Sequence, residues 1–303
     1  MKSIIIPLLV SLFLTTPLNA QETDTTDYRE FLEAYEAYLD SVRATLTLLS
    51  DTTVVLGDGL AELTVPEDYY FIDAADTYTV IVDMWGNPPE NGQGSLGMLL
   101  PRNHPIGGSE GYGIDIFFTE DGYINDEDAA EMDYDELLVD LRESIKEENE
   151  GRAAAGYEPI YLEGWAAAPH YDAVNKRLHW AKDLYFEGDE TNTLNYNILF
   201  LGRRGHLTMN VIGDLDDLPE INGDLEDILS STTYLPGHRY ADFDPSIDEV
   251  AAYGIGALIA GKMLLKTGVL ASIGIFLLKA WKLIAIGGVA LWAGVRKLLG
   301  NQA

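Results

Sequence analysis

Hydrophobic and polar positions follow two different periods along the chain. Between residues 27 and 49 apolar side chains recur every three or four positions, the period of an amphipathic helix, and Asp27 is placed to cap it. Residues 133–150 and 215–229 show the same helical spacing. Short runs between Gly, Pro, Asn and Asp clusters predict strands. These runs are 52–56, 61–65, 69–72, 79–84, 96–100, 114–119, 159–164, 178–185, 193–201 and 207–211.

The order of these elements predicts an α+β domain with a mainly antiparallel sheet and flanking helices. Gly57-Asp58-Gly59 and Gly202-Arg203-Arg204-Gly205 each separate two predicted strands, as the turn of a β-hairpin does. We find no internal repeat and no clean linker. We therefore expect an N-terminal helix within residues 21–51, followed by one domain over residues 52–245.

The C-terminal part of the chain has a different pattern, and no acidic residue follows Glu249. Apolar blocks over 250–261, 267–278 and 283–295 are each closed by a basic pair; the six basic residues are Lys262, Lys266, Lys279, Lys282, Arg296 and Lys297. Each block is about 18–20 Å long as a helix, whereas a hydrocarbon core is about 30 Å thick.

We interpret residues 246–303 as a membrane anchor. One full crossing is expected within 268–299, with lysines that extend their charged ends to the interfaces, and 250–266 is a possible second helix. Small residues such as Gly254 and Gly261 would permit self-association through close helix packing. A buried helical hairpin of a water-exposed domain is the alternative interpretation.

Residues 1–20 resemble a signal peptide, with one lysine, an apolar run and a cleavage position after Ala20. Export would place the domain in the periplasm or at the cell exterior. A single crossing of the bacterial inner membrane would leave Arg296 and Lys297 in the cytoplasm, in agreement with the positive-inside rule.

Charge is distributed very unevenly along the chain. The formal net charge is −31, from 50 acidic and 19 basic residues, and six of those basic residues follow Glu249. The first 249 residues therefore carry 13 basic against 50 acidic groups, which argues against nucleic acid as a partner. Membrane lipid should be met through the C-terminal region alone. There is no cysteine, which excludes disulfides and thiolate metal sites.

Seven stretches resemble a bacterial family of predicted membrane-anchored proteins, domain of unknown function 2167. They are LTVPEDYYFIDA (63–74), WGNPP (85–89), GYINDEDA (122–129), GWAAAPHYD (164–172), LHWAKDL (178–184), LNYNILFLGRRG (194–205) and PGHRYADFDPSIDEVAAYGIGALIAG (236–261). The resemblance implies only the layout of signal peptide, exported domain and C-terminal anchor. It implies no activity, substrate or catalytic residue.

Metal-binding candidates exist, but their spacing is not diagnostic. Asp126 and Asp128 lie in a carboxylate-dense turn that could hold Ca²⁺, although the sequence favours a solvated turn that leads into the next helix. His170 and His238 lie in predicted loops, where Asp242 could complete a hydrolytic metal site. No two histidines stand at a metal-ligand spacing, so solvated loop histidines are the alternative.

Binding candidates are equally open. Trp85 and Asn87 could contribute to a binding surface, or Trp85 could belong to an aromatic core. Arg203 and Arg204 could bind a partner's carboxylate, or balance charge at a hairpin tip. No catalytic constellation and no cofactor motif is present. The sequence therefore favours a binding or assembly module at the envelope, with a metal-dependent hydrolase of envelope material as the alternative.

Overall fold

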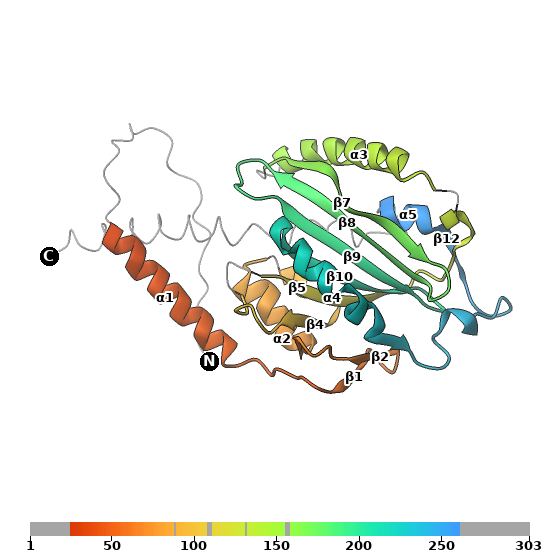
Figure 1. The fold of residues 1–303 in the computed structure, drawn as a ribbon, viewed down its shortest axis with the longest axis horizontal. Helices are drawn as coiled ribbons and strands as arrows, with labels where there is room; N and C mark the ends of the chain where they lie inside the picture. Colours follow the sequence, from red (N-terminus) through yellow and green to blue (C-terminus); the bar gives the residue numbers. More distant parts are fainter. Residues whose placement is uncertain (1–24, 88, 108–110, 131, 155–157, 261–303) are drawn as a thin grey trace.

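The main sheet has seven strands in the order β3-β4-β5-β10-β9-β8-β7, and every neighbouring pair is antiparallel. The computed structural model describes residues 25–87, 89–107, 111–130, 132–154 and 158–260. The strands are β3 (Tyr69–Ile72), β4 (Ser95–Pro101), β5 (Gly113–Thr119), β7 (Ile160–Asp172), β8 (Arg177–Phe186), β9 (Thr193–Leu201) and β10 (His206–Asp214). Strands that follow one another in the chain pair on both sides of the sheet, and β5 pairs with β10 where these two halves meet (Figure 1).

A small sheet and a helix cover one face of the main sheet. The small sheet consists of β1 (Thr53–Leu56), β2 (Ala61–Thr64) and β11 (Thr232–Tyr234), and the helix is α4 (Leu218–Ser230), entered through a short turn at Leu215–Asp217. Their apolar side chains form one continuous core with alternate residues of β5, β9 and β10. Because those strand residues alternate with polar ones, period-two patterning directs them to this first face.

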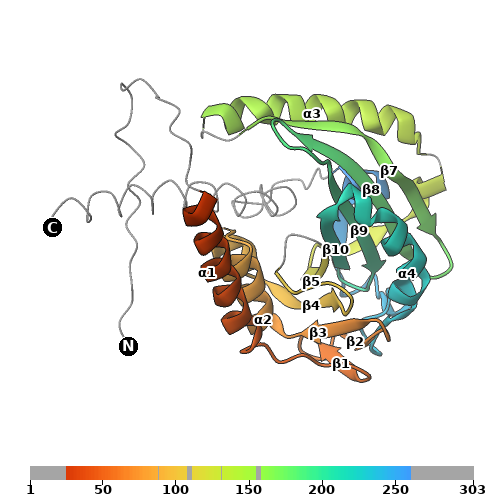
Figure 2. The ribbon, with the colours of Figure 1, turned by 60° about the vertical axis from the view of Figure 1, so that its left-hand side comes forward.

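Helices cover the second face of the main sheet at its two edges. Helix α1 (Thr25–Arg43) and helix α2 (Ala74–Tyr78) pack at the β3–β4 edge, and α3 (Tyr134–Ala154) packs on β7 and β8 (Figure 2). Short 3-10 turns occupy Pro89–Gly92, Glu127–Ala130 and Tyr240–Asp242.

Most predicted elements are confirmed, and the fold class is α+β with mostly antiparallel pairing. The predicted strand over 79–84 is wrong, because Thr79–Met84 is a π-helical turn that continues from α2. Asp73 caps α2 by accepting from the amides of Ala75 and Asp76. The β-branched composition favours a strand, but the cap and the burial of Val80 and Met84 favour a helix.

The predicted N-terminal helix ends earlier than its apolar pattern. Helix α1 ends at Arg43, and Leu49 instead forms an isolated antiparallel bridge with Phe71. Leu39 of α1 is buried, and Val42 and Leu46 pack against the same cluster. The apolar spacing beyond Arg43 therefore continues across the connection into the sheet rather than along one helix.

The chain after Ser246 is partly built into the domain. Where a helix is expected from residue 250, Val250–Gly254 forms strand β12, which pairs in parallel with β6 (Tyr123–Asn125), and helix α5 covers Ile255–Ala260. Among the described residues, no helix has the length and apolar character needed to cross a membrane. The predicted signal peptide (1–20), the predicted crossing (268–299) and the six basic residues of the predicted anchor lie outside the described residues.

Candidate functional site

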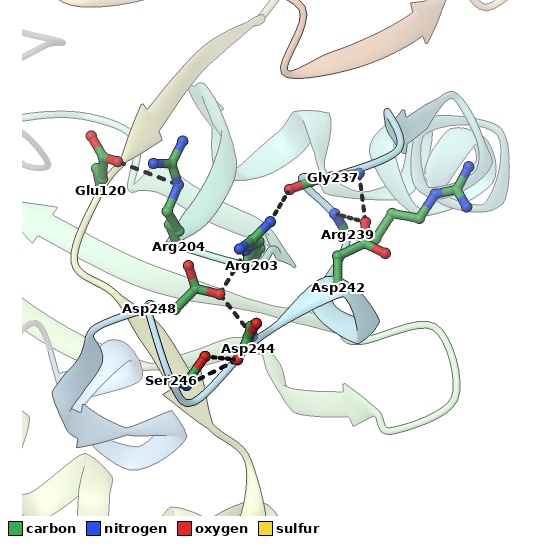
Figure 3. A network of polar contacts seen from close by, with 9 residues as sticks. All are labelled: Glu120, Arg203, Arg204, Gly237, Arg239, Asp242, Asp244, Ser246 and Asp248. Carbon is green, nitrogen blue, oxygen red and sulfur yellow. Dashed lines mark hydrogen bonds and ion pairs between the residues drawn. The ribbon is translucent and has the colours of Figure 1, made fainter.

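Arg203 fastens the β9–β10 hairpin to the loop that leads toward β12. Its Nε donates to Asp248 Oδ2 at 2.6 Å, and its Nη1 donates to the carbonyl of Gly237 at 3.3 Å (Figure 3). The hydrogen bond from Arg203 lowers the pKa of Asp248, whose side chain is only 6% exposed. Arg203 is therefore held in an internal ion pair, and hairpin-tip charge balance describes it better than a free carboxylate-binding fork.

Arg204 points to the other side of the hairpin. Its Nε lies 3.7 Å from Glu120 Oε1, and both side chains are more than half exposed. Solvent and salt screen such a pair strongly. Arg204 is thus the more available of the two arginines.

The loop carboxylates of residues 236–248 hold backbone amides. Asp242 Oδ2 accepts from the amides of Gly237 at 2.8 Å and Arg239 at 3.1 Å. Asp244 Oδ1 accepts from the amide and hydroxyl of Ser246. The main-chain carbonyl of His238 accepts from the amide of Arg203, so the loop is joined to the hairpin by backbone as well.

Asp126 is the centre of a second network, at the turn after β6. Its Oδ2 accepts from Lys176 Nζ at 2.6 Å and from the Tyr171 hydroxyl at 2.5 Å, and its Oδ1 accepts from the Tyr240 hydroxyl at 3.0 Å. Burial acts to raise the pKa of Asp126, but these hydrogen bonds overcome it, so the net pKa lies below the usual value. The carboxylate joins the β7–β8 hairpin to the loop of residues 236–248.

Two neighbouring carboxylates fasten β12 and α5. Asp128 accepts from the amides of Ile255 at 3.0 Å and Gly256 at 3.1 Å, the first two residues of α5. A Cβ at Gly254 would lie 2.5 Å from Asp128 Oδ2, which explains a glycine at that position. The hydroxyl of Tyr253 donates to Asp121. The turn of residues 121–128 therefore holds β12 and α5 against the domain, whereas the sequence predicts a solvated turn.

The metal-ligand candidates are distributed over separate places. His170 lies in strand β7 rather than in the predicted loop, and His238 lies in the loop after β11. Asp126, Asp128 and Asp242 are engaged by the ammonium, hydroxyl and amide donors given above. Within the described part of the chain, no group of three or more His, Cys, Asp or Glu could hold a metal ion.

Trp85 and Asn87 belong to the packing at the β3–β4 edge. Trp85 packs against the cluster beneath α1 and α2 and closely approaches Gly113. Asn87 is 3% exposed, and its Nδ2 donates to the carbonyl of Ile81 at 3.0 Å, which closes the π-helical turn. These contacts give both side chains a role in packing, so neither needs a binding role to account for its presence.

Comparison with known families gives a decisive match. A family model described as "Protein of unknown function (DUF2167)" matches residues 49–289. The chain belongs to the DUF2167 family. The match includes β12 and α5, so the fastened segment is part of the family's shared region.

Other comparisons add little to this assignment. The solution structure of cyanobacterial PsbP (CyanoP) from Synechocystis sp. PCC 6803 is 11% identical, covering 63% of this chain and 94% of that one, with a TM-score of 0.34. This similarity is too low to support an inference about fold or function. Among curated proteins, none matches the chain.

A buried polar row on the second face of this DUF2167 domain escaped the sequence analysis. Opposed strand positions place Asn197, Asn210 and Asp115 in line across β9, β10 and β5. Asn195 Nδ2 donates to Asn210 Oδ1 at 3.1 Å, and Ser95 Oγ donates to Asp115 Oδ1 at 2.6 Å. The available signal was the alternation of polar and apolar residues in these strands, which sequence reasoning assigns to a solvated face.

Proposed function

We propose that this DUF2167 protein is a binding or assembly module of a bacterial envelope, with an exported acidic domain held at the inner membrane by its C-terminal apolar segment. The observation that carries this proposal is the fastening of residues 246–260 to the domain. Asp248, Tyr253 and the first turn of α5 are each held by a different partner from β6, β9 or the adjoining turns.

This fastening restricts how the domain can sit relative to a membrane. Ile255 and Ile259 are fully buried, and the described part of α5 reaches Ala260, which the apolar C-terminal segment follows in the sequence. A Gly/Ser-rich connection of several residues would let a domain rotate freely, and the chain has none at this point. A fixed orientation is of use to a module that presents one surface to a partner in or near the membrane.

The acidic charge of the domain supports a protein partner away from the lipid surface and argues against nucleic acid. The first 249 residues carry 50 acidic and 13 basic groups, which repel phosphate backbones and anionic headgroups alike. Contact with lipid is therefore assigned to the C-terminal region, whose six charged residues are all basic.

The topology is tested with single cysteines, because the chain has none of its own. Val174→Cys places a thiol in the β7–β8 turn, where the side chain is 88% exposed, and Ala303→Cys places one at the C-terminus. A membrane-impermeant maleimide should label Val174→Cys in intact spheroplasts, and Ala303→Cys only after permeabilisation. Labelling of Val174→Cys only after permeabilisation would contradict export.

Binding is tested separately from topology. Thiol-directed cross-linkers are attached at Val174→Cys, Val139→Cys and Val55→Cys, which lie on different surfaces and are each more than half exposed. A binding module should give a discrete adduct from one of these positions in membranes and none from the other two. A folded, membrane-retained protein that gives no adduct at any position would contradict the binding role while leaving the topology intact.

A further inference from the structure

Two histidines whose sequence spacing matches no metal-binding motif face one another across the β7–β8 hairpin. His170 in β7 is directly opposite His179 in β8, and their ring centroids are 5.3 Å apart with planes inclined at 49°. Opposed residues of an antiparallel pair point to the same face of a sheet. The sequence analysis did not pair these residues because it placed His170 in a loop, whereas β7 extends to Asp172.

This separation suits two ligands of one metal ion. Two imidazoles bound to a tetrahedral Zn²⁺ at N–Zn distances of about 2.0–2.1 Å hold their centroids about 5 Å apart. β7 is the last strand of the seven-stranded sheet, and His170 is exposed, so an ion and its waters can reach the pair from solvent.

The surroundings hold His179 in a ligand-ready form. Its Nδ1 lies 3.0 Å from the hydroxyl of Tyr196, which is fully buried. When Nδ1–H donates to that hydroxyl oxygen, Nε2 keeps its lone pair for a metal, the arrangement by which outer partners orient ligating histidines.

The nearest charged groups on the same face balance one another. Asp172 and Arg177 are opposite each other, two residues further along each strand from the histidines. Arg177 also lies over the ring of Phe200, with 5.6 Å between its Cζ and the ring centroid. A cation between the histidines therefore meets no uncompensated positive charge from this pair.

We propose that His170 and His179 form a two-histidine site for a late transition-metal ion, with Cu²⁺, Ni²⁺ and Zn²⁺ as the ions that imidazole ligands favour. Water completes the coordination, so the site is of the weak, exchangeable kind. Tyr196 is a positioning residue for the ligand His179. This site is independent of the proposed binding role, and its failure would leave that role untouched.

The test is a metal titration of the full chain in non-ionic detergent, with a purification tag free of histidine. Ni²⁺ and Cu²⁺ are added in turn, and binding is followed by calorimetry and, for Cu²⁺, by its nitrogen hyperfine pattern in electron paramagnetic resonance. One ion per chain should bind, with two nitrogen ligands, and affinity should fall in acid because protons compete for the imidazoles.

Variants assign the ligands. His170→Gln and His179→Gln should each remove most of the binding, and the double variant should lose little more, because one histidine alone is a poor ligand set. Tyr196→Phe keeps the buried ring and should weaken binding about tenfold. His238→Gln, at a histidine outside the pair, should change nothing. Equal affinity in the wild type and the double variant, or loss of binding in His238→Gln alone, would overturn the proposal.

Discussion

Two aspartates of this domain lie in contrasting surroundings, and their pKa values are shifted in opposite directions. Asp126, at the end of the sheet, meets one ammonium and two phenol hydroxyls, and its net pKa is lowered. Asp115, on the second face of the sheet, is 6% exposed and receives a hydroxyl hydrogen bond from Ser95. Burial raises the pKa of Asp115 to about 6, and the bonds from Ser95 and the Ile116 backbone offset it only in part.

The comparison shows that the partners of a carboxylate decide its role. Two neutral donors compensate only part of the cost of burying a charge, whereas a cation with two further donors compensates most of it. Asp126 therefore joins two loops at neutral pH, whereas Asp115 destabilises the fold whenever it is ionised.

The largest expected effect is that of Asp126→Ala. Removing the carboxylate leaves Lys176 and Tyr171 without this acceptor, whereas the Tyr240 hydroxyl keeps the carbonyl of Ile124 at 2.8 Å. The expected cost is about 2–3 kcal/mol in the free energy of unfolding. Denaturation of the full chain in detergent, followed by near-UV circular dichroism, measures this.

The effect of Asp126→Ala should depend on pH. Because the folded pKa is below the unfolded one, the stabilisation by Asp126 is present above the unfolded pKa and is lost as pH falls through the folded pKa. The difference between wild type and variant should therefore shrink in acid. A difference that is constant between pH 7 and pH 3 would contradict the ion-pair account.

A smaller effect of opposite sign is expected for Asp115→Asn. The folded pKa of Asp115 is raised, so its favourable contribution is present below the unfolded pKa and is lost as pH rises through about 6. The neutral amide avoids this loss. As pH rises from 4 to 8, the free energy of unfolding of the variant should therefore increase by about 1–2 kcal/mol relative to that of the wild type. The same denaturation series at both pH values measures it, and a gain that does not change with pH would exclude an ionised Asp115 as the cause.

The smallest effect is expected on the exposed surface of α3. Glu147→Gln removes one of many solvated carboxylates from this helix and should change the free energy of unfolding by less than about 0.5 kcal/mol. It serves as the matched acidic control for Asp126→Ala. A loss as large as that of Asp126→Ala would mean that net charge, and not specific contacts, determines stability here.

The element pattern was largely predictable because it is local. Period-two runs identified most of the strands, and period-3.6 runs identified α3 and α4. The prediction failed at Thr79–Met84, where the cap at Asp73 and burial outweighed β-branched composition. It also missed β12, whose five residues are apolar enough to be taken for the beginning of the membrane segment.

The candidate site was only partly predictable because its contacts are long-range. The density of acids at residues 121–128 is visible in the sequence, but Tyr171, Lys176 and Tyr240 reach Asp126 from 45 to 114 residues away. Likewise, alternation around Asp115 predicts a solvated face, whereas the folded chain leaves that side chain only 6% exposed.

The central claim is that the turn of residues 121–128 fastens the chain that leads into the apolar segment. The most direct measurement is hydrogen exchange by mass spectrometry on peptides covering residues 246–260, in the full chain, for wild type, Asp128→Ala and Glu127→Ala. Asp128 accepts from the amides of Ile255 and Gly256, whereas the neighbouring Glu127 is an exposed residue of the same turn.

Loss of such a cap costs about 1 kcal/mol, so exchange at residues 255–260 should be about fivefold faster in Asp128→Ala. Exchange in Glu127→Ala should equal that of wild type, and β9 and β10 should be unchanged in both variants. Equal exchange rates at residues 255–260 in Asp128→Ala and wild type would contradict the account, because the segment would then be held by something other than this turn.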